Sequence, residues 1–288
     1  MSAISIVIVS YNAKADLEAC LQSLHATPPA LAHDVVVVDN DSSDGSADAA
    51  ARWPGVRVIR MGRNAGFSAA NNAGIRETGA PLVLLLNNDT IVPAGAIDRL
   101  VQRLDATPEA AIAGPRLVDA AGRPELSFGR MMSPAAEVRQ KIIGRLYERG
   151  FGPTVRWVAR ETRREQFVDW VSGACLLVRR PDAEAVGLLD ERFFLYTEDV
   201  DFCASMRARG RKVLFTPVSE IVHRRGRSRA AAPAMSNVAY RRSHLAFYEK
   251  HHPAWAPMLK LYLRVRGHLP PAGQDAIGDK ISPGENRD

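Results

Sequence analysis

The sequence predicts an α/β protein whose central sheet is mostly parallel and is flanked by helices. Apolar runs with the character of buried strands alternate with helical patterns through the first 115 residues, as in parallel sheets that are covered on both faces. The first four runs end in polar residues, at the strand ends where such sheets bind ligands. The 288 residues suffice for one large domain with a substantial core.

The elements of the first half follow from the spacing of their apolar residues. One helix carries Leu17, Leu21 and Leu24 at intervals of three and four. Pro93, which suits a first helical turn, marks the start of another helix. The expected strands are 4–10, 34–40, 56–61, 81–87 and 111–115, and between them we expect the helix through Leu17, an Ala-rich helix from 46, an Ala/Asn-rich helix ending near Gly79 and a helix from about 93.

The second half is less regular. Residues 116–165 show no clean strand period, so we expect a loop and helix excursion over one face. Residues 167–180 are expected to form one long strand, bent at Ser172-Gly173. A helix capped by Thr197 and stopped by Gly210 should follow. The remaining expected elements are two short strands, KVLFTP (212–217) and EIVH (220–223), an amphipathic helix at about 236–250, and a disordered tail at 268–288.

Composition bounds the class of protein. With 46% hydrophobic and 24% charged residues, the chain is ordinary for a globular protein, and no apolar run approaches the roughly 18 residues that cross a bilayer. No basic stretch precedes the first strand, so we expect no signal peptide and a cytoplasmic location. Cys20, Cys175 and Cys203 share no metal-like spacing and are expected to be buried thiols.

The net charge of +6 is unevenly distributed. Residues 1–100 contain seven Lys and Arg against ten Asp and Glu, a net of −3, so the remainder carries +9. The basic excess is concentrated in 139–164 and 207–229. A solvated surface explains such segments, and so does attraction to an anionic membrane, a phosphorylated substrate or nucleic acid. Charge alone does not distinguish these readings.

Polar residues at the ends of four strands mark the expected binding site. They are Ser10-Tyr11-Asn12, Asp39-Asn40-Asp41, Gly62-Arg63-Asn64 and Asn87-Asn88-Asp89. Because the carboxyl ends of parallel strands meet at one edge of a sheet, we expect these side chains to surround one ligand. The glycine loop that begins at Gly62 fits neither the dinucleotide fingerprint nor the P-loop, which leaves Arg63 and Asn64 as candidates for diphosphate or ribose contacts.

Two strand-end carboxylates indicate specific chemistry. Asp39 needs a hydrogen-bond donor, which a nucleobase imide N–H or a ribose hydroxyl would supply. Capping and turn chemistry explain the following Ser43, Asp44 and Gly45 without a ligand. Asp89 is suited to a hard divalent cation whose other oxygen ligands come from phosphates, although capping of the next helix is an alternative.

A cluster of acids and a single histidine complete the candidate residues. On a helix, Glu198 and Asp201 share a face and Asp199 points elsewhere. Crowded carboxylates raise the pKa of at least one member toward that of a useful base, whereas the plainer explanation is that acids favour a helix N-terminus. His223 closes a strand before Arg224-Arg225 and is a candidate imidazole ligand or phosphate donor.

In this order and spacing, the motifs resemble those of a family-2 glycosyltransferase of the GT-A fold, in the branch that includes rhamnosyltransferases of the cell envelope. The resemblance covers about residues 4–250. Each motif alone would be ordinary, and their combination is specific. The motifs are IVIVSYN, VVVVDNDSSDGS, NAGFSAANNAGI, LLLNNDTIV, SGACLLVRR, FFLYTEDVDFC and VHRRGRS.

The resemblance implies a role for each matching residue. Asp39 would bind the base, Asp199 would be the inverting base, and Asp89 would bind the metal. His223 would help to hold metal or diphosphate. The family's DxD motif reads Asn-Asn-Asp here, so the first acid is absent. Asp89 and the diphosphate would therefore supply more of the metal's ligands. The other donor-binding candidates are Ser10, Tyr11, Asn12, Asp41, Arg63, Asn64 and Asn88, and the acceptor or accessory candidates are Glu198, Asp201, Trp170 and Gly173.

The implied activity is the inverting transfer of rhamnose or a similar hexose from a UDP- or dTDP-linked donor, with Mn²⁺ or Mg²⁺. The implied acceptor is a hydroxyl of a glycan or a polyprenyl-diphosphate-linked sugar in cell-envelope polysaccharide synthesis. One GT-A domain would span 1–267, with a nucleotide-binding half at 1–115 and an acceptor-binding half at 116–267. Peripheral attachment to the inner face of the plasma membrane is a further expectation, and the oligomeric state is left open.

Three other functions are alternatives to this activity. A sugar-nucleotide nucleotidyltransferase would share a similar sheet, but such enzymes carry a Gly-rich basic loop after the first strand, where this chain has SYNAKAD. A degenerate binding module without catalysis is disfavoured by the joint presence of Asp39, Asp89 and Asp199. A nucleic-acid binder would need aromatic stacking platforms or groove-reading helices, for which we find no pattern, so no nucleic-acid partner is expected.

Overall fold

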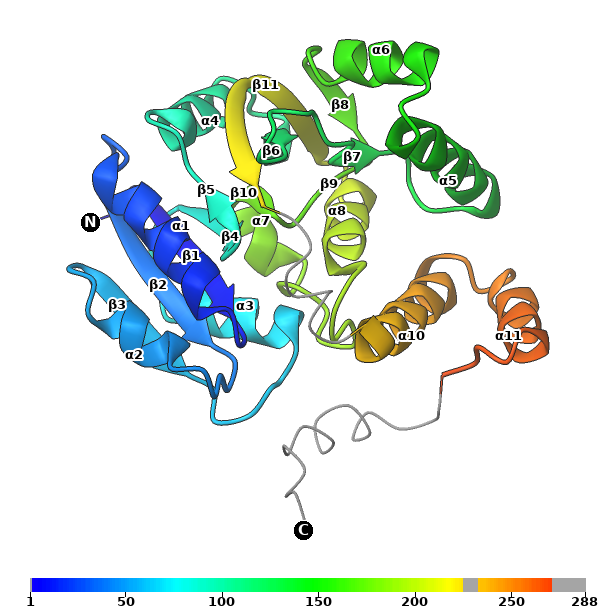
Figure 1. Ribbon diagram of the computed structural model, residues 1–288, viewed down its shortest axis with the longest axis horizontal. Coiled ribbons are helices and arrows are strands. Elements are labelled where there is room, and N and C mark those ends of the chain that lie inside the picture. Colours follow the sequence, from blue (N-terminus) through cyan, green and yellow to red (C-terminus); the bar gives the residue numbers. More distant parts are fainter. Residues whose placement is uncertain (1, 225–232, 271–288) are drawn as a thin grey trace.

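The computed structural model describes residues 2–224 and 233–270. Within these residues a nine-stranded sheet has the order β3-β2-β1-β4-β10-β6-β11-β5, and β8 pairs with β11 beside that path. Helices lie on both faces of the sheet (Figure 1). The predicted α/β class with a mostly parallel, helix-flanked sheet is therefore confirmed.

The strands of the first half agree with the sequence pattern. Successive parallel pairings join β3 to β2, β2 to β1 and β1 to β4. The fifth strand, β6, is longer than predicted at both ends. The strands are β1 (Ile4–Ser10), β2 (His33–Asp39), β3 (Val56–Arg60), β4 (Leu82–Asn87) and β6 (Ala110–Val118).

The predicted helices of the first half are also present, with two shifted ends. The Ala/Asn-rich helix ends at Arg76, not near Gly79 as expected. The helix expected from Pro93 begins at Ala96, because Gly95 has a left-handed backbone (φ 68°) that interrupts the helical path. A short strand, β5 (Thr90–Ile91), precedes that helix. The helices are α1 (Lys14–Ala26), α2 (Ser46–Ala51), α3 (Phe67–Arg76) and α4 (Ala96–Asp105).

Residues 116–165 contain the expected helices, α5 (Pro134–Glu148) and α6 (Gly152–Glu161). The single strand predicted for 167–180 is wrong. Three short strands replace it, and each pairs with a different neighbour, because the chain turns at Asp169 and again at 172–174. They are β8 (Gln166–Val168), β9 (Trp170–Val171), which pairs with β7 (Phe128–Gly129), and β10 (Cys175–Arg179).

The end of the described chain brings two further corrections. The two short strands predicted after 212 form one strand, β11 (Lys212–His223), because an irregularity in its pairing with β6 absorbs residues 217–219 without ending it. Thr197 precedes α8 (Glu198–Ala208), but its left-handed backbone (φ 72°) differs from an extended N-cap, and its side chain makes no capping hydrogen bond to this fully described helix. The other helices are α7 (Arg180–Ala185), α10 (Pro233–His251) and α11 (Ala256–Val265).

The core is divided by the sheet into two layers. Ile4, Ile6 and Ile8 of β1 pack on one face with α1 and α4. Val7 and Val9 point to the other face, toward α3 and α8, as the alternation of side chains along a strand requires. The three cysteines are free and buried, as predicted.

Two expectations from the sequence fall partly outside the described residues. The basic stretch that extends to residue 229 is described only to Arg224, and the predicted tail is described only to residue 270. In the described part of the chain, no helix is both long enough and apolar enough to span a bilayer.

Candidate active site

The polar strand ends converge as predicted. Ser10 is the register partner of Asp39 at the ends of β1 and β2. On the other side of β1, Val9 is the partner of Asn87 at the end of β4. The side-chain amide of Asn88 closes this junction by donating to the Ser10 hydroxyl at 3.5 Å. The carboxyl ends of β2, β1 and β4 therefore form one continuous polar edge.

One carboxylate oxygen of Asp39 lacks a hydrogen-bond donor among the described residues. The residue is only 4% exposed, and its Oδ2 accepts from the Ser42 backbone N–H at 3.2 Å. Its Oδ1 is buried and has no hydrogen-bond partner within the described residues. Because a buried acceptor without a donor is costly, this oxygen is suited to a ligand N–H or O–H.

Other donor-site candidates hold the surrounding loops together. Asn12 accepts from the Ser43 backbone N–H at 2.8 Å and so joins the loops after β1 and β2. Asn64 accepts from the side chain of Asn40 at 2.8 Å, which joins the loops after β2 and β3. Asn40, one of the strand-end residues expected at the site, thus positions a loop 24 residues away in the sequence. Tyr11 is half-buried at this edge, and Asp41 and Arg63 are exposed.

Asp89 and His223 face each other across the pairing of β5 with β11. Thr90 is the register partner of His223, and His223 Nε2 lies 3.3 Å from Asp89 Oδ1. The Asp89 carbonyl also accepts from the Arg224 backbone N–H at 2.8 Å. The predicted pairing of these two candidate ligands is thus present in the fold, although they are 134 positions apart in the sequence.

Glu125 is a member of this cluster that the sequence did not reveal. It is 6% exposed, and its Oε2 lies 3.2 Å from His223 Nδ1. Burial alone would lower the pKa of His223, but the two carboxylates of Asp89 and Glu125 outweigh that effect and raise the pKa to about 9. The segment around Glu125 has no regular pattern, so nothing in the sequence ties it to His223.

The residues present fit a divalent metal that arrives together with phosphate oxygens. Among the described residues, no three metal-binding side chains converge, so Asp89 and His223 would supply two ligands and a diphosphate the rest. Asp89 Oδ1 is buried, and His223 Nε2 lies 3.3 Å from it, so the two candidate ligand atoms are already side by side. The contact between Glu125 and the distal ring nitrogen of His223 is the support that metal-binding histidines commonly have. One carboxylate and one imidazole suit Mn²⁺, and Mg²⁺ accepts the carboxylate with phosphate oxygens.

Asp199 is held at the start of α8 by two backbone groups. The Gly173 N–H donates to its Oδ2 at 2.8 Å, and the Val200 N–H donates to its Oδ1 at 2.8 Å. Burial raises the pKa of Asp199 above the ordinary 3.8, against the effect of these N–H groups. Burial raises the pKa of the adjacent Glu198 further, helped by the charge of Asp199.

A short path of contacts joins Asp199 to the strand ends. Gly173 precedes Ala174, whose carbonyl accepts from the Asn87 backbone N–H at 2.9 Å. Asn87 is followed directly by Asn88 and Asp89. The partly buried Asp199 carboxylate and the candidate metal-binding turn thus belong to the same edge of the sheet.

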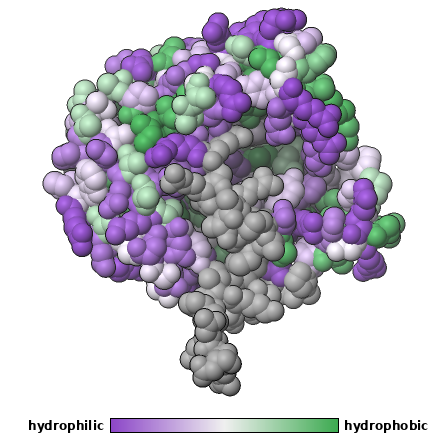
Figure 2. Space-filling view, viewed as in Figure 1, coloured by the Kyte–Doolittle hydropathy of each residue, from purple (hydrophilic) through white to green (hydrophobic). Residues whose placement is uncertain are grey.

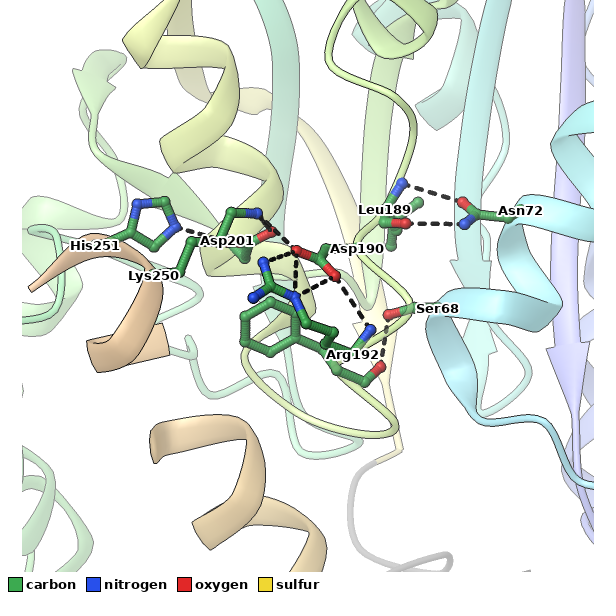
Figure 3. Close-up of polar contacts among 9 residues, drawn as sticks. Ser68, Asn72, Leu189, Asp190, Arg192, Asp201, Lys250 and His251 are labelled. Carbon is green, nitrogen blue, oxygen red and sulfur yellow. Dashed lines mark hydrogen bonds and ion pairs between the residues drawn. The ribbon is translucent and has the colours of Figure 1, made fainter. Parts of the chain in front are cut away.

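Asp201 has a different environment from Asp199. Its side chain is 1% exposed and is surrounded by Lys250 Nζ at 2.8 Å and His251 Nε2 at 2.6 Å, both from α10. Lys250 also bonds Asp190 at 2.9 Å, so one network ties α8, α10 and the loop before α8 together (Figure 3). Asp201, an accessory candidate, therefore helps to hold α8 in place against α10.

The same loop is fastened to α3 on its other side. Ser68 donates to the Phe193 carbonyl at 2.7 Å, and Asn72 exchanges hydrogen bonds with the backbone of Leu189 (Figure 3). The remaining accessory candidate, Trp170, is 8% exposed and donates its indole N–H to the Arg130 carbonyl at 2.9 Å. These contacts fix the segments on either side of Asp199.

Comparison with solved structures identifies the fold. A mannosyltransferase from Pyrobaculum calidifontis, solved in complex with GDP-Man and Mn²⁺, superposes with a TM-score of 0.61 at 18% identity, covering 90% of this chain and 68% of that one. GalNAc-T7 with UDP, GalNAc and Mn²⁺ superposes with a TM-score of 0.58 at 16% identity, covering 78% of this chain and 44% of that one. The fold is that of GT-A glycosyltransferases.

Sequence comparison is more specific. An N-acetylglucosaminyl-diphospho-decaprenol L-rhamnosyltransferase of Mycobacterium tuberculosis is 32% identical over 282 residues, which cover 92% of this chain and 91% of that protein. A dTDP-rhamnosyl transferase, RfbF, of Shigella flexneri is 28% identical over 75% of this chain and 67% of its own length. The profile of glycosyl transferase family 2 matches residues 5–170. The resemblance found in the motifs is confirmed, and the chain belongs to glycosyl transferase family 2.

Proposed function

We propose that this glycosyltransferase is metal-dependent and inverting, and that it transfers rhamnose or a similar hexose during cell-envelope polysaccharide synthesis. The observation that carries the proposal is the position of Asp199, a partly buried carboxylate held by Gly173 next to the β4 turn that carries Asp89. Similarity to two rhamnosyltransferases supports the sugar.

The donor is a UDP- or dTDP-linked sugar. Asp39 Oδ1, which is buried without a partner in the described chain, would accept from the imide N–H of the base, and both bases offer that group. Tyr11, Asp41 and Arg63 surround the rim of the same edge and are available to the ribose and diphosphate. The nucleotide-binding half would be 1–115 and the acceptor-binding half 116–267.

The chemical step is a single displacement at the anomeric carbon. The acceptor oxygen forms a bond to that carbon as the bond to the diphosphate oxygen breaks on the opposite face, and the acceptor proton passes to Asp199. Burial supports this role because it raises the pKa of Asp199 and makes the ionised form a stronger base. The configuration is inverted because the acceptor attacks the face opposite the leaving group in one step, without a covalent sugar intermediate.

Asp89 and His223 would hold the divalent cation, Mn²⁺ or Mg²⁺, and Glu125 would keep the His223 ring oriented. When bound, such an ion neutralises negative charge on the departing diphosphate. The acceptor would be a glycan or a polyprenyl-diphosphate-linked sugar, as the name of the mycobacterial relative suggests. A lipid-linked acceptor would put the enzyme at the inner face of the plasma membrane as a peripheral protein.

A thermal-shift panel of UDP- and dTDP-sugars, with and without Mn²⁺, tests the donor. We expect one family of nucleotide sugars to stabilise the protein in a metal-dependent manner, and Asp39→Ala to lose that response. Asp48→Ala is the matched control, because Asp48 is an exposed carboxylate paired with Arg60. Binding without any release of nucleoside diphosphate in the presence of acceptors would instead identify a binding module without catalysis.

A further inference from the structure

Helix α11 carries an apolar stripe on its outer side. Its exposed apolar residues recur at intervals of three and four, which places them on one face of the helix. Trp255, just before the helix, and Leu269, beyond its end, are also exposed, by 47% and 39%. The residues within the helix and their exposures are Met258 (53%), Leu261 (59%), Tyr262 (55%) and Val265 (78%).

The opposite face of α11 is the one that packs against the protein. Ala256 and Leu263 are buried, and Leu259 packs against the cluster that contains Phe247 and Tyr248 of α10. The larger apolar side chains of this helix therefore point away from the core. A contiguous exposed apolar face of this kind marks a binding surface in soluble proteins.

The charged residues of α11 and the segment after it are all basic. Residues 256–270 contain Lys260, Arg264 and Arg266 and no acidic residue. Lys260 pairs with Glu249 of α10 at 2.6 Å, and the Arg266 guanidinium lies 5.7 Å from the centre of the Tyr262 ring. An apolar face with Trp and Tyr, flanked by basic residues, is the composition of helices that lie in the interface of anionic membranes.

A second helix presents the same combination. On α5, Val138 and Ile142 are 58% and 53% exposed, beside the exposed Arg139 and Lys141. Both α5 and α11 contact α10, the first through a hydrogen bond between Glu137 and His244 and the second through the Lys260 pair. Apolar side chains are visible at the right-hand edge of the molecule in Figure 2, where Figure 1 places α5 and α11.

We propose that the apolar stripe of α11, assisted by the exposed face of α5, docks the protein on an anionic lipid bilayer. Charge complementarity selects this occupant, because basic side chains border the apolar residues and no acidic residue lies among 256–270. The surface is argued from α11 and α5 alone. Its purpose, to bring the active site to a lipid-linked acceptor, rests on the proposed function.

Co-sedimentation with vesicles of phosphatidylglycerol and phosphatidylcholine in equal parts tests the surface. We expect the full chain to bind these vesicles at low salt, to bind phosphatidylcholine vesicles weakly, and to lose affinity as salt rises. The double variant Leu261→Gln/Val265→Gln should bind at least about tenfold more weakly. Arg264→Gln should bind about fivefold more weakly.

Val218→Gln is the matched control. Val218 is an apolar residue of β11 that is 47% exposed, and its carbonyl accepts from Arg99 of α4. Because it belongs to neither α11 nor α5, its replacement should leave vesicle binding unchanged. Nucleotide-dependent thermal shifts should be the same in all these variants and in the wild type, which separates docking from folding and from the donor site. Vesicle binding without any nucleotide response would uphold the docking surface while the proposed function fails.

Three results would overturn the proposal. The first is a wild-type protein that does not bind the anionic vesicles, or a double variant that binds them equally well. The second is a dimer in sedimentation equilibrium that the double variant dissociates, together with absence of vesicle binding, because a second copy of the chain would then be the occupant. The third is binding that appears only after deletion of residues 271–288, because that segment would then cover the stripe.

Discussion

The backbone N–H of Gly173 donates to Oδ2 of Asp199 at 2.8 Å, and a Cβ placed on Gly173 would lie 3.3 Å from the Asp199 Cβ. The contact is possible because residue 173 has no side chain, so the loop between β9 and β10 approaches the start of α8 closely. The same loop reaches β4 through Ala174. Gly173 therefore sets the position of the Asp199 carboxylate relative to the strand ends.

Replacing Gly173 by Ala should lower kcat and leave donor binding unchanged. The added methyl group pushes Asp199 away by a few tenths of an ångström, and misplacement of a catalytic group by about 1 Å costs on the order of a hundredfold, so we expect a decrease of about tenfold. Steady-state kinetics and nucleotide titration check this. Gly144→Ala on α5 is the control, because its Cβ would meet no atom within 4 Å. A rise in KM with unchanged kcat would assign Gly173 to substrate binding instead.

Asp199→Asn should reduce transfer by about 10²- to 10⁴-fold, the contribution of a general base. In the wild type, activity should fall as the pH is lowered through the pKa of Asp199, because only the ionised carboxylate accepts a proton. Burial raises that pKa, so the decline should begin above the pH expected for an ordinary Asp with a pKa of 3.8. A pH profile of kcat checks this, and unchanged turnover of the variant would exclude Asp199 as the base.

Glu125→Gln should weaken metal-dependent nucleotide binding by about 10- to 100-fold, as the loss of a carboxylate that supports a metal-binding histidine does. The reason is that Glu125 fixes His223 Nδ1, and so aims Nε2 at Asp89. Calorimetric titration with nucleotide and Mn²⁺ measures the change. Glu109→Gln, an exposed carboxylate paired with Lys212, should have no effect. Equal affinity in the two variants would mean that His223 acts without this support.

Glu198→Gln should raise the melting temperature at pH 8. Glu198 is buried, its Oε2 has no hydrogen-bond partner among the described residues, and its pKa is raised well above the ordinary 4.5 by burial and by Asp199. The folded state therefore holds a proton that the unfolded state releases above about pH 4.5, so wild-type stability falls as the pH rises through that interval. The gain from the variant should shrink toward zero near pH 4.5. A gain that is the same at both pH values would exclude ionisation as its cause.

Most of the fold could be predicted because its signals are local. The apolar runs of β1, β2 and β4 and the helices between them follow from spacing alone, and the strand-end position of Asp39 and Asp89 follows from the parallel sheet. The errors at 167–180 and 212–223 have one cause, since a run of apolar residues does not state which neighbours it pairs with. Glu125 was missed for the same reason, because it acts through a contact with His223, which is distant in the sequence.

Strand β10 has a consequence for how the protein is synthesised. It runs antiparallel between β4 and β6, so those two strands of the first half are held apart by residues 175–179. When only the first half of the chain has been synthesised, β4 has an unpaired edge. An unpaired edge favours mispairing with other strands. Folding of the nascent chain thus waits for the segment that also brings Gly173 to Asp199. The insertion of β10 and the placement of Gly173 are completed together, and a truncated first half should aggregate before it could bind a nucleotide.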